Sequence, residues 1–166
     1  MGSGKSHWGK IWATESGMDF FDLDAIIEEK EKMSIDQIFE KKGEDYFRLR
    51  ESEELATFAH ISNGIIACGG GTPCFHNNIN KINEMGFSVY LKGTPNQLLK
   101  NLLPENGKRP LLKMANPAEK LFFIEQKLAE RASYYDQAKM ILLLADLTDS
   151  SLHTIINSTS TCKKDF

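Results

Sequence analysis

The chain has 166 residues, of which 41% are hydrophobic and 26% are charged, with a net charge of −3. This length suits one globular domain, and the interspersed charges and the lack of any apolar run of about 20 residues argue against partners such as nucleic acid or membranes. Three cysteines without Cys-x-x-Cys spacing and the lack of a signal-peptide pattern predict a cytoplasmic protein without a disulfide framework or zinc site.

The first residues match the second half of a phosphate-binding loop. Residues 1–6 read Met-Gly-Ser-Gly-Lys-Ser, which is Gly-x-x-x-x-Gly-Lys-[Ser/Thr] without its first glycine. In such a loop the backbone N–H groups hold phosphates, the lysine reaches the outer phosphates and the hydroxyl ligates Mg²⁺. At this point a chance Gly/Ser-rich terminus or a cloning remnant is an open alternative.

The rest of the chain predicts strands that alternate with helices. Helices are expected over 6–16, from a cap at Asp24, over 34–43 and 44–60, after Thr94, over 116–135 and from about 150. Strands are expected over 20–24, 64–67, 88–92 and 140–145, and the last is apolar throughout, as in a strand buried on both faces. Residues 103–115 have the composition of a mobile loop.

This alternation predicts an α/β fold with a parallel sheet covered by helices on both faces. Ligands of such folds bind at the carboxyl ends of the strands. Asp22 and Asp24 lie at one such end, and Gly69–Gly71 follow another. Their shared placement favours the phosphate-loop interpretation of the first residues.

The few arginines are candidate ligand-binding residues. Of twenty basic residues sixteen are lysine, so the four arginines stand out. A guanidinium group offers a planar fork for carboxylate or phosphate that an ammonium group cannot imitate. We assign Arg50 to a solvated helix face, which leaves Arg48, Arg109 and Arg131 as candidates.

Five ordered motifs resemble those of the shikimate kinase family, from Met1 to about Ile156. The motifs are Gly-Ser-Gly-Lys-Ser (2–6), Phe-x-Asp-x-Asp (20–24), Gly-Glu-x-x-Phe-Arg-x-x-Glu (43–51), Gly-Gly-Gly (69–71), and Arg-Pro-Leu-Leu (109–112) followed by Arg-Ala-x-x-Tyr (131–135). The resemblance implies a three-layer P-loop kinase fold that transfers the γ-phosphate of ATP to the 3-hydroxyl of shikimate, in the route to chorismate and the aromatic amino acids. It implies a monomer with Mg²⁺ as cofactor. One domain over 1–157, a helical shikimate-binding region over 24–60, a lid over 103–115 and a flexible tail over 158–166 are expected.

The resemblance also assigns roles to residues around the phosphates. It implies catalytic roles for Lys5, Asp24 and Arg109, with Arg109 carried by the lid. Mg²⁺ is expected at Ser6 and, through water, at Asp22. The implied ATP-binding residues are Gly2, Ser3, Gly4, Lys5, Ser6, His7 and Arg109.

On the shikimate side, the resemblance implies that Arg48 and Arg131 grip the carboxylate. Glu51, three residues after Arg48, is placed to orient it. Asp24 and the glycine loop Gly69, Gly70 and Gly71 are expected to contact the hydroxyl groups. The implied apolar walls of the pocket are Phe39, Phe47, Pro110 and Leu111.

The sequence departs from the family at its start. His7 and Trp8 stand where the family usually has threonine and a small aliphatic residue. In the family a central strand precedes the phosphate loop, and without it we expect two half-sheets with unpaired edges. The expectation is that about ten further residues precede Met1 in the natural protein.

Other interpretations stay open if the resemblance is set aside. Asp24 is then equally a helix N-cap, Arg48 and Arg131 surface ion-pair partners, Gly69–Gly71 a turn, and the phenylalanines core residues. Two alternative functions are a related kinase for another polyol acid such as gluconate and a non-catalytic nucleotide- or shikimate-binding remnant. The set of Arg48, Gly69–Gly71 and Arg131 disfavours the first, and the absent loop glycine and His7 motivate the second.

Overall fold

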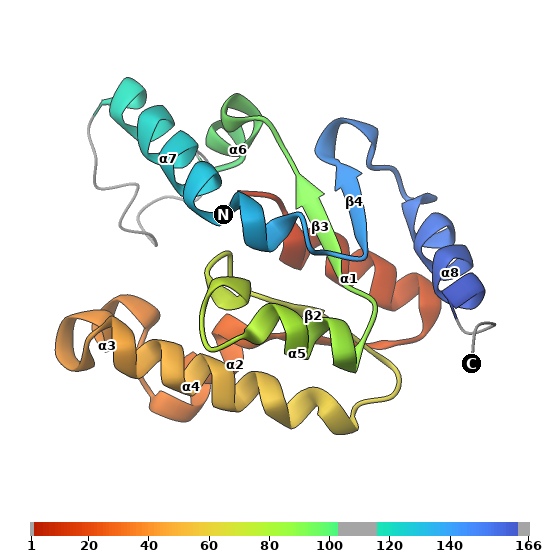
Figure 1. The fold of residues 1–166 in the computed structure, drawn as a ribbon, viewed down its shortest axis with the longest axis horizontal. Coiled ribbons are helices and arrows are strands. Elements are labelled where there is room, and N and C mark those ends of the chain that lie inside the picture. The colour runs from red at the N-terminus through yellow and green to blue at the C-terminus, as the bar shows by residue number, and fades with distance from the viewer. Residues whose placement is uncertain (1, 103–115, 163–166) are drawn as a thin grey trace.

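The computed structural model describes residues 2–102 and 116–162, with side chains described up to residue 159 (Figure 1). The strands are β1 (Asp19–Asp22), β2 (Gly64–Ala67), β3 (Val89–Lys92) and β4 (Met140–Leu143). The helices are α1 (Lys5–Ser16), α2 (Leu23–Glu31), α3 (Ile35–Lys42), α4 (Glu44–Thr57), α5 (Asn78–Met85), α6 (Pro95–Leu102), α7 (Pro117–Tyr135) and α8 (Ser151–Cys162). Short 3-10 helices are η1 (Phe58–His60), η2 (Thr72–Cys74) and η4 (Leu144–Asp146).

The described strands pair in parallel, as predicted, but they form two pairs. β1 pairs with β2, with Phe20 opposite Ile65, and β3 pairs with β4, with Tyr90 opposite Ile141. The two pairs lie apart in Figure 1. The parallel α/β architecture is therefore confirmed. The strands of the described residues form two separate half-sheets, as expected.

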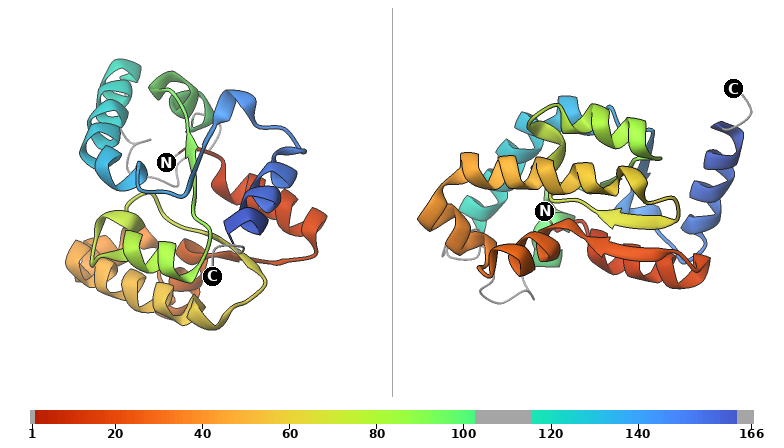
Figure 2. Two further views of the ribbon diagram at one scale, coloured as in Figure 1. Left: turned by 45° about the vertical axis from the view of Figure 1, so that its right-hand side comes forward. Right: turned by 90° about the horizontal axis from the view of Figure 1, so that it is seen from below.

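A cavity of about 560 Å³ lies between the two strand pairs. Residues of both β2 and β3 line it, together with Trp12 of α1. The indole N–H of Trp12 is buried there and has no hydrogen-bond partner among the described residues. The two pairs are joined instead by helix packing, because Trp12 shares one apolar cluster with Leu91 of β3, Leu152 of α8 and Ile65 of β2. Figure 2 shows α8, in dark blue, close to α1, in red.

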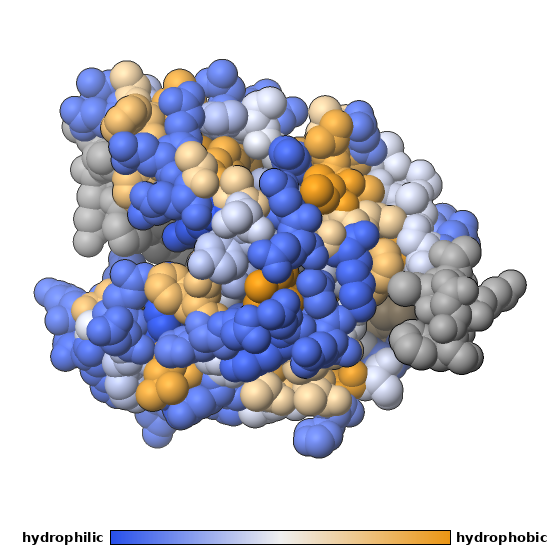
Figure 3. Space-filling model, in the orientation of Figure 1, coloured by the Kyte–Doolittle hydropathy of each residue, from blue (hydrophilic) through white to orange (hydrophobic). Residues whose placement is uncertain are grey.

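The prediction that residues 140–145 form a strand buried on both faces is wrong. The strand ends at Leu143, and its burial alternates, with Ile141 40% and Leu143 50% exposed. β4 has β3 as its one described strand neighbour, and only one of its faces packs on the apolar clusters. Hydrophobic atoms accordingly gather over this region on a surface that is otherwise largely hydrophilic (Figure 3).

Helix termini follow the sequence closely, except at α2, α4 and α8. Ser34 and Gln37 form the predicted capping box of α3, and Asn116 caps α7. The cap of α2, however, is Asp22 rather than Asp24, because the Asp22 carboxylate accepts from the backbone N–H of Ala25 at 3.4 Å. Residues 23 and 24, predicted to end the strand, therefore form the first turn of α2. α8 also continues to Cys162, past the predicted start of the tail at 158.

Residues 23–60 fold as a helical layer beside β1 and β2. Leu23 and Ile27 of α2, Ile38 of α3 and Phe47 and Leu55 of α4 form one buried cluster. α4 ends at Thr57 and passes into η1, so the helix predicted to run to residue 60 changes type in its last turn. No described helix is both long and apolar enough to cross a lipid bilayer.

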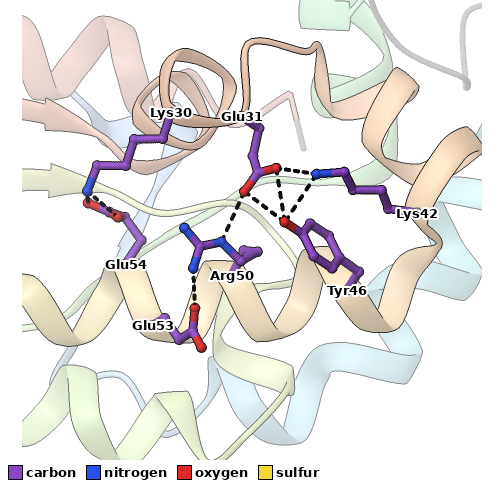
Figure 4. A network of polar contacts seen from close by, with 7 residues as sticks. All are labelled: Lys30, Glu31, Lys42, Tyr46, Arg50, Glu53 and Glu54. Carbon is purple, nitrogen blue, oxygen red and sulfur yellow. Dashed lines mark hydrogen bonds and ion pairs between the residues drawn. The ribbon is translucent and has the colours of Figure 1, made fainter.

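The outer face of this layer carries a network of charges (Figure 4). Glu31 at the end of α2 accepts hydrogen bonds from Lys42, Tyr46 and Arg50. Arg50 also pairs with Glu53, and its side chain is 37% exposed. The assignment of Arg50 to a solvated helix face therefore agrees with the structure.

Candidate active site

The phosphate-loop residues form a backbone turn that leads into α1. Gly2 and Gly4 have φ values of 68° and 72°, in the left-handed region that glycine adopts at little cost. A Cβ on Gly2 would lie 2.6 Å from the carbonyl oxygen of Leu98, so this position also lacks room for a side chain. Gly4 is the N-cap residue of α1 and makes no side-chain cap hydrogen bond, so the first N–H groups of this helix can hold an anion.

Four side chains meet beside this loop. The hydroxyl of Ser6 donates to Oδ2 of Asp22 at 2.6 Å, which joins the start of α1 to the end of β1. The ammonium group of Lys5 lies 3.6 Å from Oδ2 of Asp24, and the two side chains are 24% and 31% exposed. The structure thus brings Lys5 and Asp24, two of the predicted catalytic residues, close to Ser6 and Asp22, the two predicted Mg²⁺ ligands.

The oxygens of Ser6 and Asp22 fit the chemistry of Mg²⁺. This ion prefers hard oxygen ligands and keeps several waters, so it needs only one or two protein groups. The described residues contain no cluster of three or more His, Cys, Asp or Glu side chains that could hold a metal alone. A hydroxyl and carboxylate pair beside a phosphate loop is therefore a fitting donor set for Mg²⁺ bound together with a nucleotide.

Arg48 is held in a buried position on α4. Its side chain is 9% exposed, so the alternative of a surface ion-pair residue is wrong. Nη1 donates to Glu51 at 2.8 Å, whereas Nη2 donates to Glu44 at 2.9 Å. The guanidinium carbon lies 4.4 Å from the ring centroid of Phe75 and 5.1 Å from that of Phe47. Glu51 therefore contacts Arg48, which supports the predicted orienting role of Glu51, and the aromatic rings favour the positive charge of Arg48.

The predicted wall residues Phe39 and Phe47 stack with ring centroids 4.9 Å apart. Phe47 is also part of the helical core, with 3% exposure. Phe39 lies at the edge of that cluster and 5.8 Å from the Arg48 guanidinium. Core packing and contact with the candidate site are therefore compatible for these residues.

The glycine loop leaves room for the side chains around it. A Cβ on Gly69 would lie 2.9 Å from Oδ1 of Asp24 and 3.1 Å from Oε1 of Glu51. A Cβ on Gly71 would lie 2.6 Å from Nη1 of Arg48. Neither glycine has a positive φ, so space rather than backbone conformation requires glycine here. The interpretation of this loop as a mere turn does not account for these approaches.

Arg131 reaches this region from α7. Its neighbour one turn later, Tyr135, donates its hydroxyl hydrogen to the carbonyl oxygen of Gly70 at 2.6 Å. Burial raises the pKa of Tyr135, and the nearby charge of Arg131 partly opposes that rise. The end of α7 is thus fixed against the glycine loop, on the same side as Arg48.

Cys68 lies directly before the glycine loop and does not act as a nucleophile. Burial raises the pKa of its thiol to about 12, with a further contribution from the negative charge of Glu51. A thiol with this pKa is protonated at neutral pH, and the thiolate is the reactive form. Cys68 is partly buried and packs against the apolar cluster of the helical layer, as a small apolar residue does.

Several residues of this region were missed in the sequence. Phe75 contacts Arg48, and Thr72, Asn78 and Glu44 take part in its hydrogen-bond network. Glu44 had a usable signal, because it precedes Arg48 by four residues on a predicted helix. Conversely, Arg109, Pro110, Leu111 and the predicted lid over 103–115 lie outside the described residues. His7 packs edge-on against Trp8, with ring centroids 5.5 Å apart.

The fold and the site define a P-loop kinase for a small molecule. A family model described as shikimate kinase matches residues 1–160. The chain belongs to the shikimate kinase family and is an ATP-dependent kinase.

Individual relatives agree with this assignment. A shikimate kinase of Phocaeicola vulgatus is 36% identical over 149 residues, which cover 90% of this chain and 85% of the relative. The crystal structure of shikimate kinase from Bacteroides thetaiotaomicron superposes with a TM-score of 0.86 at 33% identity, covering 99% of this chain and 94% of that one. A shikimate kinase from Acinetobacter baumannii in complex with shikimate has a TM-score of 0.83 at 30% identity, covering 100% and 91%.

Proposed function

We propose that the chain transfers the γ-phosphate of ATP to the 3-hydroxyl of shikimate and releases ADP and 3-phosphoshikimate. The single observation that carries this proposal is the convergence of Lys5, Asp24 and the buried Arg48 on the glycine loop. Lys5 can bind phosphate, Asp24 can accept a proton from a hydroxyl group, and the guanidinium group of Arg48 can bind a carboxylate. Membership of the family and the related structure with bound shikimate support the same substrate.

On the nucleotide side, the backbone N–H groups of residues 2–6 would hold the phosphates. Phosphoryl transfer passes through a loose transition state, so the protein acts mainly by alignment and charge neutralisation. Lys5 would bind the outer phosphates, with its ammonium group already directed toward Asp24. In this geometry the phosphate to be transferred would lie next to the accepting group.

Ser6 and Asp22 would hold Mg²⁺, Ser6 directly and Asp22 through a water molecule. When bound, the ion supplies positive charge that neutralises the phosphate oxygens. The short hydrogen bond between the two side chains keeps both oxygens at one place before the ion arrives.

On the acceptor side, Arg48 and Arg131 would bind the shikimate carboxylate and so fix the position of the ring. The Asp24 carboxylate then accepts the proton of the 3-hydroxyl, while the oxygen of that hydroxyl forms a bond to the γ-phosphorus. The bond between this phosphorus and the β,γ-bridging oxygen breaks, and the electron pair stays on ADP. Phe39, Phe47, Pro110 and Leu111 would form the apolar walls of the pocket. Arg109 of the lid would bring its positive charge to the transferred phosphate.

The decisive experiment is an assay of ADP release with Mg²⁺-ATP and either shikimate or gluconate, on the purified chain. We expect turnover that depends on shikimate and none with gluconate. Turnover with gluconate would instead support the related polyol-acid kinase. ATP binding in calorimetry without any turnover would support the non-catalytic binding protein. Sedimentation measures the proposed monomeric state in the same preparation.

A further inference from the structure

A buried carboxylate lies at the centre of the candidate site. The side chain of Glu51 is 1% exposed, and a carboxylate removed from water is unfavourable unless its oxygens are hydrogen-bonded. Oε2 accepts from Nη1 of Arg48 at 2.8 Å, and Oε1 accepts from the hydroxyl of Thr72 at 2.6 Å. Among the described residues, each oxygen thus has a different donor, one the candidate substrate-binding arginine and one a neutral hydroxyl.

Thr72 is itself held in place. It is fully buried, and its backbone N–H donates to the carbonyl oxygen of Gly69 at 3.1 Å. Its own carbonyl oxygen accepts from the side-chain amide of Asn78 at 3.0 Å, and Asn78 in turn accepts from Ser52 of α4 at 2.8 Å. The hydroxyl of Thr72 therefore occupies a fixed position between the glycine loop and the helix that carries Arg48.

We propose that Thr72 is a positioning residue, whose hydroxyl holds the Glu51 carboxylate in the orientation that directs Arg48 toward the substrate carboxylate. The inference rests on the proposed function, since it concerns how the same site binds its acid. Arg48 has a second partner in Glu44, but that side chain is 54% exposed and lies on the outer side. The inner bond to Glu51 is the one that fixes the guanidinium beside Gly71, where a Cβ would already collide with it.

The charges around Glu51 explain why a neutral hydroxyl matters. Burial raises the pKa of Glu51, and the hydrogen bond from Thr72 and the charge of Arg48 oppose that rise. Asp24 of α2 is a like charge that raises the pKa further. The charge of Glu51 also acts on the thiols of Cys68 and Cys74. Burial raises the pKa of both thiols, so they are neutral at pH 7. Without the Thr72 hydroxyl, Glu51 takes up a proton at higher pH and its ion pair with Arg48 is lost.

The test compares Thr72→Val, which removes the hydroxyl at similar volume, with Thr72→Ser, which keeps it. Loss of a hydrogen bond to a charged group predicts a rise of about tenfold in the KM for shikimate in Thr72→Val, with the KM for ATP within about twofold of wild type. The KM for shikimate should also begin to rise at a higher pH as the solution is acidified. Thr72→Ser should restore both values. Thr57→Val is the matched control, because it removes a threonine hydroxyl at the end of α4, where that hydroxyl donates to the carbonyl oxygen of Glu54.

A double-mutant cycle separates positioning from general stability. In a Glu51→Gln background, Thr72→Val should raise the KM for shikimate by less than about twofold, because the carboxylate through which Thr72 acts is gone. Equal effects of Thr72→Val in both backgrounds would overturn the proposal, as would an unchanged KM and pH profile in Thr72→Val. A Thr72→Ser variant with a KM for shikimate as high as that of Thr72→Val would overturn it too. If Thr72→Val fails to fold, Thr72→Ser alone tests the proposal, because a protein that keeps the hydroxyl should keep the wild-type KM for shikimate. Absence of shikimate-dependent turnover in the wild type would contradict the proposed function instead.

Discussion

The hydroxyl group of Tyr135 and the carbonyl oxygen of Gly70 form a 2.6 Å hydrogen bond between α7 and the glycine loop. The two residues are 65 positions apart in the chain. Because Arg131 lies one helical turn before Tyr135, this bond helps to set how far the α7 arginine stands from Arg48. The positions of Arg48 and Arg131, the two candidate carboxylate-binding residues, are thus both set relative to the same three glycines.

Tyr135→Phe should weaken shikimate binding by removing this bond. A neutral hydrogen bond contributes about 0.5–1.5 kcal/mol, which corresponds to a rise of about two- to tenfold in the KM for shikimate. Since burial raises the pKa of Tyr135, the hydroxyl keeps its proton through neutral pH and the effect should not depend on pH between about 6 and 8. Steady-state kinetics check this, with Tyr134→Phe as the control. An unchanged KM in Tyr135→Phe would show that the loop keeps its position without α7.

Gly71→Ala should impair shikimate binding more than ATP binding. The added Cβ would lie 2.6–2.8 Å from three atoms of the Arg48 guanidinium, so the arginine must leave its position between Glu51 and Phe75. We expect a loss of at least about tenfold in shikimate affinity by calorimetry, the scale of a misplaced charged hydrogen-bond partner. Gly86→Ala is the control, because nothing lies within 4 Å of its added Cβ. Equal affinities of the two variants would contradict the close approach at Gly71.

Glu31→Gln should lower stability in a pH-dependent way. Hydrogen bonds from Lys42, Tyr46 and Arg50 lower the pKa of Glu31 against an opposing effect of burial, and the bond from Lys42 is the largest cause. A depressed carboxylate pKa stabilises the fold above the unfolded value of about 4.3, and that contribution is lost as the pH falls through the lower folded value.

For this network of partly solvated charges we expect Glu31→Gln to cost about 1 kcal/mol at pH 7, a decrease of about 2–4 °C in Tm. Urea unfolding of both proteins from pH 7 down to pH 3 measures the difference. It should shrink only below about pH 4. A difference that grows on acidification would contradict the assigned direction. Lys41→Gln, which changes a neighbouring exposed charge, is the control.

Arg109→Ala should lower kcat far more than it raises the KM for shikimate. Arg109 is outside the described residues, and its role follows from the resemblance of Arg-Pro-Leu-Leu (109–112) to the lid motif of the family. A cation that reaches the phosphate only during transfer stabilises the transition state rather than the bound substrates. Single-turnover kinetics with saturating shikimate and ATP measure this effect. Unchanged turnover would remove the lid arginine from the mechanism.

Local signals in the sequence predicted much of the fold. The capping box at Ser34, the stop at Gly43 and the cap at Asn116 each act within a few residues, and the structure has all three. Parallel strands followed from their alternation with helices, which also placed Asp22, Asp24 and Gly69–Gly71 at one edge.

The features that were missed depend on contacts between distant segments. The bond from Thr72 to Glu51 joins residues 21 positions apart, and neither residue shows in the sequence how the loop is placed on α4. Similarly, the apolar run 140–143 has the composition of a strand with two covered faces, yet its exposure depends on which elements pack against it. The choice between Asp22 and Asp24 as the α2 cap depended on backbone geometry at the end of β1, which two equivalent carboxylates do not reveal.

Because the strands form two separate pairs, bound substrates would connect two parts of the molecule. Asp24, Arg48 and the glycine loop belong with the β1–β2 pair. The phosphate loop contacts both halves, because Ser6 donates to Asp22 of β1 and the side-chain amide of Asn101 in α6, after β3, donates to the carbonyl oxygen of Gly2 at 2.8 Å. A nucleotide and an acid bound together would therefore fasten one half of the molecule to the other. Saturation with both compounds should slow amide hydrogen exchange in β3 and β4 as well as around the site, because the halves then open as one unit.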